Sequence, residues 1–175
     1  MVRTLRVVAT VSVLSLTQLL ASPRHLEPAP PAVATADAGA AFEKLRALAG
    51  TWTFTTGTDR GRVSYELVSN GTAIIERVMN EEHGETGMVS VIHLDGDRLI
   101  LQHYCTSGNQ PRLVSPGLEG DEIRFTFERA SNLRSSEAGH IHGAVFAFAG
   151  PGPFASRWTW RENGTETTST RRHTR

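Results

Sequence analysis

The chain has 175 residues, and its 18 Lys and Arg balance its 18 Asp and Glu, so its formal net charge is zero. Nucleic acids are recognised through clustered positive charge, and no basic run precedes Arg171-Arg172, so a nucleic-acid partner is not expected. The lone cysteine, Cys105, excludes an internal disulfide, and stability must therefore come from the core.

The first 21 residues have the pattern of a secretory signal peptide. Arg3 and Arg6 precede an uncharged run from Val7 to Leu20, which the small residue Ala21 follows. That run is short for a membrane span. We therefore expect cleavage after Ala21 and an exported chain, periplasmic or secreted, with no stable membrane span afterwards. An uncleaved anchor is the alternative.

Composition divides the rest of the chain into a linker and one domain. Residues 22–40 are rich in Pro and Ala and lack apolar periodicity, which predicts a disordered linker. Residues 41–175 form a domain of ordinary size. At its start, Phe42, Leu45 and Leu48 lie at helical spacing before Gly50, which predicts a short amphipathic helix that plugs or flanks the structure after it.

From Thr51 onward the chain alternates between strand and turn patterns. Asn70-Gly71, Asp95-Gly96 and Asn163-Gly164 predict two-residue hairpin loops, and Glu119-Gly120-Asp121 predicts a further turn. Sequential hairpins predict an all-β fold, a closed antiparallel up-and-down barrel of about eight to ten strands, because closure removes the edge strands. Strands are expected near residues 51–56, 62–69, 72–79, 87–94, 97–105, 111–115, 122–128, 141–148, 155–162 and 165–171.

The order of these features resembles the lipocalin-like (calycin) barrels. The features are a short helix, Gly50-x-Trp52 at the first strand, sequential hairpins and a basic last strand. The resemblance implies that Trp52 closes one end of the barrel and that Arg171 or Arg172 packs over it. About ten strands is closer to the fatty-acid-binding and nitrobindin-type barrels than to eight-stranded lipocalins.

A second resemblance rests on the segment from His103 to Arg112. His-Tyr-Cys at 103–105, followed by Gly-Asn-Gln-Pro-Arg at 108–112, is similar to a set of secreted bacterial proteins with no assigned function. This resemblance covers most of residues 41–172 and implies no biochemistry.

The hairpin around Asp95-Gly96 predicts that His103 and Cys105 point into the barrel. Pairing Leu94 with Asp97 produces one apolar face that ends at these two residues, whereas the other face carries charged and amide side chains.

Three further strands add polar and aromatic groups to the predicted interior. The register across Asn70-Gly71, in which Ser69 pairs with Thr72, places Glu76 on an apolar face opposite Tyr65. In the strand at 141–148, aromatic residues favour an inward face that also carries His140 and His142, although the opposite face is apolar too. In the strand at 155–162, alternation with arginines turns Trp158 inward.

An apolar cavity with a few convergent polar groups is the usual form of a small-molecule site. The sequence predicts such a cavity, in which three histidines and a glutamate meet and an arginine lies at the rim. Amide and guanidinium groups of the loop after Cys105 would orient a carboxylate or other polar head group, or alternatively tie down a long loop. The predicted ligand-binding residues are Glu76, His103, Cys105, Asn109, Gln110, Arg112, His140, His142 and Trp158.

Each central residue also has a structural interpretation. Glu76 would accept a hydrogen bond from Tyr65, His103 would be a satisfied core histidine, and Cys105 would be a small buried hydrophobe.

Three function classes remain open. The favoured one is an exported binding protein for a small, largely apolar ligand with a polar head group. The alternatives are an enzyme that uses Glu76 or a histidine as general base, and a protein-interaction module. No metal is favoured, and a site of His103, His140 and His142 is the alternative, with metal-bound water as catalyst. The sequence identifies no cofactor, ligand or oligomeric state.

Overall fold

The computed structural model describes residues 37–80, 84–150 and 152–175. The predicted signal peptide at 1–21 and residues 22–36 of the predicted linker lie outside the described residues. Among those described, no helix is long and apolar enough to cross a membrane.

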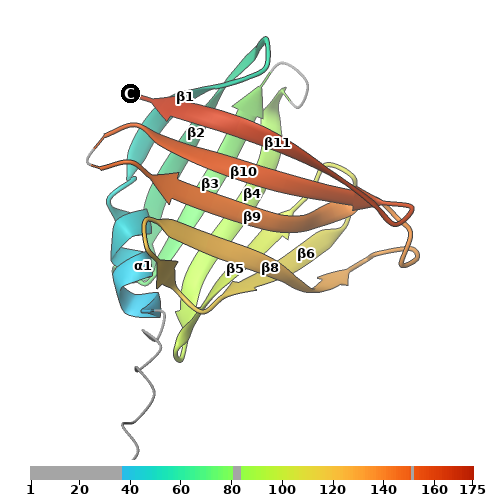
Figure 1. The fold of residues 1–175 in the computed structure, drawn as a ribbon, viewed down its shortest axis with the longest axis horizontal. Coiled ribbons are helices and arrows are strands. Elements are labelled where there is room, and N and C mark those ends of the chain that lie inside the picture. The colour runs from blue at the N-terminus through green and yellow to red at the C-terminus, as the bar shows by residue number, and fades with distance from the viewer. Residues whose placement is uncertain (1–36, 81–83, 151) are drawn as a thin grey trace, which may run out of the picture. The chain divides into compact units, whose positions relative to one another are not determined.

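Within these residues, ten antiparallel strands close into a barrel, which confirms the predicted fold class (Figure 1). Neighbouring strands follow chain order, and the pairings of β6 with β8 and of β1 with β11 complete the ring. Of the named strands, β7 pairs only with β8, and it was not predicted. The strands are β1 (Gly50–Thr56), β2 (Asp59–Val68), β3 (Ala73–Asn80), β4 (Gly84–Asp95), β5 (Arg98–Tyr104), β6 (Gln110–Ser115), β7 (Leu118–Glu119), β8 (Glu122–Ser131), β9 (His140–Phe148), β10 (Phe154–Glu162) and β11 (Thr165–Thr174).

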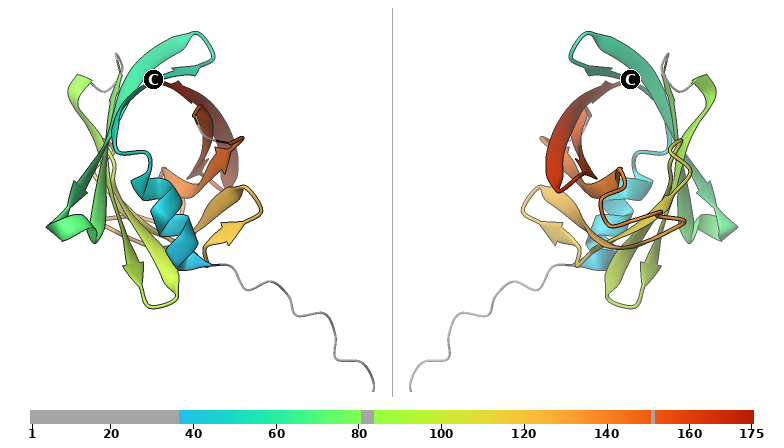
Figure 2. Two further views of the ribbon diagram at one scale, coloured as in Figure 1. Left: turned by 90° about the vertical axis from the view of Figure 1, so that its left-hand side faces the viewer. Right: turned by 90° about the vertical axis from the view of Figure 1, so that its right-hand side faces the viewer.

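The one α-helix among the described residues, α1 (Ala38–Arg46), lies across one end of the barrel (Figure 2). It begins three residues before the predicted start, because the side chain of Asp37 accepts a hydrogen bond from the backbone N–H of Ala40 at 2.9 Å and caps the first turn. The helix buries Phe42 and Leu45 against the barrel core, as its periodicity predicted.

Trp52 closes the barrel at the α1 end. Its indole N–H donates to the carbonyl oxygen of Leu48 at 2.7 Å, and its ring meets Phe154 edge to face. The arginine over this ring is Arg175, with its guanidinium carbon 4.6 Å from the ring centroid, and not Arg171 or Arg172 as the resemblance implied. Three residues of extended strand lie between Arg171 and Arg175, so Arg171 is too far along β11 to cover Trp52 and reaches the interior instead.

Two hairpin registers agree with the prediction. β2 and β3 pair Tyr65 with Glu76. β10 and β11 are joined by Asn163-Gly164, whose φ angles of 49° and 72° are the two positive values that a type I′ turn requires.

The register of the β4–β5 hairpin differs from the prediction by two residues. Asp95 pairs with Arg98, whereas the sequence predicted that Leu94 pairs with Asp97. The loop is therefore Gly96 and Asp97, in which Gly96 alone has a positive φ, as expected where glycine takes the first position of a type II′ turn. A displacement by an even number of residues leaves each side chain on its predicted face.

Candidate functional site

A cavity of ≈550 Å³ opens at the end of the barrel opposite α1. The β1–β2 turn, the β5–β6 loop and the β10–β11 hairpin surround its mouth, and its walls combine apolar side chains of β4, β9 and β10 with polar side chains of β11. Its volume lies in the range of small-molecule sites. The lining residues are Thr56, Asp59, Met88, Cys105, Thr106, Ser107, Ile141, Trp158, Trp160, Thr167, Thr168, Ser169 and Arg171.

Arg171 is the one cation among the described residues that line this cavity. Alternation along β11 turns its side chain inward, between β1 and β10. Its guanidinium carbon lies 5.1 Å from the ring centroid of Phe54 and 5.6 Å from that of Trp158. The faces of aromatic rings attract cations, so these contacts position the guanidinium inside the barrel.

A row of buried polar side chains crosses four adjacent strands beneath the cavity. Tyr65, Glu76, Ser90 and His103 are consecutive cross-strand partners on β2, β3, β4 and β5. The Tyr65 hydroxyl donates to Glu76 Oε1 at 3.0 Å, and Ser90 Oγ lies 3.0 Å from His103 Nδ1. All four residues are at most 2% exposed, so this row is part of the barrel interior.

The row lies next to the cavity, one step deeper in the barrel, and its four residues are not among those that line the cavity. Met88 and Cys105 line the cavity wall, and each lies two residues further along the same face as Ser90 and His103 respectively. The His103 ring is 5.5 Å from that of Trp158, another wall residue.

Burial and the charge of Arg171 shift the pKa of the Glu76 carboxyl group in opposite directions. Burial raises the pKa of its carboxyl group above the usual range, whereas the positive charge of Arg171 and the hydrogen bond from Tyr65 lower it. The pKa of Tyr65 is raised well above its usual value by burial and by the charge of Glu76, so the phenol remains the hydrogen-bond donor at neutral pH.

The predicted pair His140 and His142 lies outside this cavity, in contact with Phe127. His140 Nε2 is 3.1 Å from His142 Nδ1, and both rings lie 4.8 Å from the Phe127 ring. On the other side, Arg161 approaches His142 Nε2 at 3.3 Å. Burial and the charge of Arg161 lower the pKa of His142.

The separation has a local cause in the pairing of β9 with β10, where His142 of β9 has no partner on β10. The register between β9 and β10 shifts after Thr159, so that Ile141 pairs with Trp160 and lines the cavity in place of its histidine neighbours. A strand irregularity of this kind changes which residues face inward. The structure therefore does not bring His140 and His142 together with His103.

Asn109 and Gln110 hold the β5–β6 loop in place, which agrees with the structural alternative. Asn109 Nδ2 donates to the carbonyl oxygen of Gly139 at 2.8 Å, and Gln110 Nε2 donates to that of Gly108 at 3.0 Å. Neither residue lines the cavity described above.

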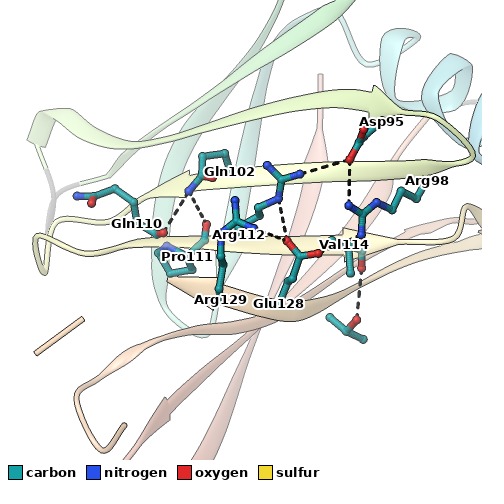
Figure 3. Close-up of polar contacts among 10 residues, drawn as sticks. Asp95, Arg98, Gln102, Gln110, Pro111, Arg112, Val114, Glu128 and Arg129 are labelled. Atoms are coloured by element: carbon teal, nitrogen blue, oxygen red, sulfur yellow. Dashed lines mark hydrogen bonds and ion pairs between the residues drawn. The ribbon is translucent and has the colours of Figure 1, made fainter. Parts of the chain in front are cut away.

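Arg112 points away from the barrel interior, on the outer face of β6 (Figure 3). Its guanidinium forms ion pairs with Glu128 at 2.9 Å and Asp95 at 3.5 Å. Two of the predicted residues, Cys105 and Trp158, line the cavity, while Glu76 and His103 are buried in the barrel interior next to it.

No group of three or more His, Cys, Asp or Glu side chains among the described residues is arranged to hold a metal ion.

Sequence reasoning missed Arg171 as a cavity residue, although the sequence contains the signal. The Asn163-Gly164 loop fixes the β10–β11 register and pairs Trp158 with Ser169. Alternation along β11 then places Ser169, Arg171 and His173 on the inward face of Trp158.

Together, the fold and the cavity define a closed antiparallel β-barrel that is open at one end, consistent with a lipocalin-like barrel. A comparison with models of known protein families found no match, and a comparison with curated proteins found none.

Proposed function

We propose that this protein is an exported binding protein that holds a small, largely apolar ligand in the barrel cavity. The observation that carries the proposal is a ≈550 Å³ cavity that two tryptophans, Trp158 and Trp160, line together with one inward guanidinium, that of Arg171. Small-molecule sites combine mostly apolar walls with a few polar groups that orient the ligand.

The ligand's apolar part would lie against Trp158, Trp160 and Ile141. Each CH₂ group buried there contributes about 0.8 kcal/mol to binding. The polar head group would face Arg171, whose planar guanidinium binds oxygen acceptors in a fixed geometry. This replaces the predicted position of the head group near Arg112, which lies on the outer face.

Export of the chain is part of this proposal and is supported by Arg3, Arg6 and the uncharged run that follows them. N-terminal sequencing of exported protein should recover a chain that begins at Ser22. An intact Met1 in the exported fraction would contradict cleavage.

Ligand binding is tested by a substitution on β11 that places a large side chain in the cavity. Ser169 lines the cavity opposite Trp158, whereas the next residue, Thr170, lies on the outer face opposite Arg157. Ser169→Trp should weaken binding of a naphthalene-based probe at least tenfold, measured by titration calorimetry. Thr170→Trp is the matched control and should bind the probe as the wild type does.

Mass spectrometry of the natively purified protein would identify a ligand that co-purifies with it. The binding proposal fails if the folded wild type binds neither charged nor neutral naphthalene probes, or if Ser169→Trp and Thr170→Trp bind them equally well.

A further inference from the structure

We propose that the cavity binds an organic anion at Arg171 and that Glu76 takes up one proton when the anion binds. This inference rests on the proposed function, because it names the charge of the head group and the group that compensates it. Carboxylates, sulfonates and phosphate esters share the required chemistry, which is a negatively charged oxygen acceptor on an apolar body.

The argument begins with the charges inside the barrel. Arg171 lines the cavity wall, 5.6 Å from the ring of Trp158, and that ring lies 5.5 Å from His103 in the same row of polar residues as Glu76. The positive charge of Arg171 acts on Glu76, which is 1% exposed. Without an anion, the carboxylate of Glu76 and the guanidinium of Arg171 balance each other. Burial of an isolated charge is costly, so each group stabilises the charged form of the other.

An anion at Arg171 would place a second negative charge near the same guanidinium. Two anions in a poorly solvated site repel each other, and one of them is then favoured in its protonated form. Glu76 is suited to take this proton, because its Oε1 accepts a hydrogen bond from Tyr65 and its Oε2 is buried without a hydrogen-bond partner among the described residues. The proton comes from solvent, and no other bond changes.

The other titratable groups around Glu76 limit which group can take up the proton. Tyr65 on β2 has a raised pKa and stays protonated, while His173 on β11 has a pKa of about 3 and stays neutral. Asp59 lines the cavity mouth. On β5, Nδ1 of His103 lies 3.0 Å from the hydroxyl of Ser90, the cross-strand neighbour of Glu76, and this imidazole is the alternative proton acceptor.

The test uses two naphthalene probes with matched apolar bodies. 2-Naphthalenesulfonate stays anionic between pH 5 and pH 8, so its own titration does not contribute, and 2-naphthalenemethanol is neutral. Wild-type affinity for the sulfonate should rise as the pH falls, by up to about tenfold per pH unit between the free and bound pKa of Glu76. Affinity for the neutral probe should not change with pH.

Calorimetry in two buffers of different ionisation enthalpy counts the protons taken up and needs no variant. We expect uptake approaching one proton with the sulfonate in this pH window and none with the neutral probe. Absence of uptake with the sulfonate across pH 5–8 would overturn the inference even if every variant misfolds.

Three variants test which residue binds the anion and which residue takes up the proton. Glu76→Gln should bind the sulfonate at pH 8 as tightly as the wild type does at low pH, with no pH dependence. Arg171→Gln should lose sulfonate binding and keep binding of the neutral probe. His142→Gln removes a histidine outside the cavity and should keep the wild-type pH profile.

The outcomes separate this inference from the proposed function. If Glu76→Gln keeps the wild-type pH profile, or His103→Gln alone abolishes it, the proton does not bind to Glu76 and the inference is wrong. If both probes bind with no pH dependence, the binding function stands and the proton coupling fails. If neither probe binds, the proposed function itself fails.

Discussion

At the scale of single residues, Arg171 connects the cavity with the buried polar groups beneath it. It contacts the aromatic rings of Phe54 and Trp158, and its charge lowers the pKa of both Glu76 and His173. The sign of the effect follows from the charge: a cation favours an ionised carboxylate and disfavours an ionised imidazole.

His173 provides a prediction about stability and pH. Its ring stacks on Phe154 at 4.1 Å, its Nε2 lies 2.9 Å from Ser156 Oγ, and burial and Arg171 lower its pKa to about 3. A histidine in the unfolded chain titrates near pH 6.5. Between these values the unfolded state binds more protons, so acidification lowers the free energy of unfolding by up to about 1.4 kcal/mol per pH unit.

We expect the wild type to lose stability relative to His173→Gln as the pH falls from about 6.5 to about 4. Urea unfolding at several pH values measures the difference. Parallel stability profiles for the two proteins would show that His173 does not stay neutral in the folded state.

At the scale of elements, an ionic network reinforces the seam where β6 meets β8 (Figure 3). A register shift after Arg112 leaves Glu128 of β8 without a partner on β6, and its carboxylate forms ion pairs with Arg112 at 2.9 Å and with Arg98 of β5 at 3.0 Å. One carboxylate thereby links three strands across the place where the sheet closes.

Replacing Glu128 with Gln should lower the free energy of unfolding by about 1 kcal/mol, because a network with partly buried members contributes more than an exposed pair. The matched control is Glu66→Gln, which removes a single exposed pair with Arg77 at 3.9 Å and should have little effect. Denaturant unfolding at low and high salt measures both. Equal costs for the two variants would show that the network adds nothing to the seam.

The start of α1 lies against the turn before β7, which requires glycine. Gly117 has φ of +132°, and a Cβ there would meet backbone atoms of Asp37 and Ala38 within 2.6 Å. We expect Gly117→Ala to lower the free energy of unfolding by about 2–4 kcal/mol, because it strains the backbone and displaces the helix.

Gly120 is the control for this substitution, since its φ of +60° is also positive but no atom lies within 4 Å of an added Cβ. Gly120→Ala should lower the free energy of unfolding by about 1 kcal/mol. Thermal unfolding compares the two variants, and equal losses would show that the contact with α1 is not important for stability.

At the scale of the whole domain, closure joins every strand of the ring to two neighbours. The core is continuous from Trp52 at the α1 end to Trp158 near the cavity. A ring of strands without a free edge has no strand that can detach first, which favours a single cooperative transition.

We therefore expect unfolding curves from far-UV circular dichroism and tryptophan fluorescence to share one midpoint. In Trp52→Phe, fluorescence reports on Trp158 and Trp160 alone, and its midpoint should still coincide with that of circular dichroism. A lower fluorescence midpoint in this variant would show that the cavity end unfolds before the rest of the barrel.

The sequence by itself determined the strands, most of the turns and the inward direction of Glu76 and His103. These features depend on local information, because alternation has a period of two and turn glycines mark the hairpins. Even the two-residue error at Asp95-Gly96 left His103 inside.

Only the tertiary structure decided which inward side chains share a site. Closure of the ring brings Arg171 of the last strand close enough for its charge to act on Glu76 of the third, while the register shift beside Trp160 separates His142 from the cavity. Pairing between strands distant in the chain, and the irregularities within it, are set by packing around the whole barrel. No local sequence pattern encodes them.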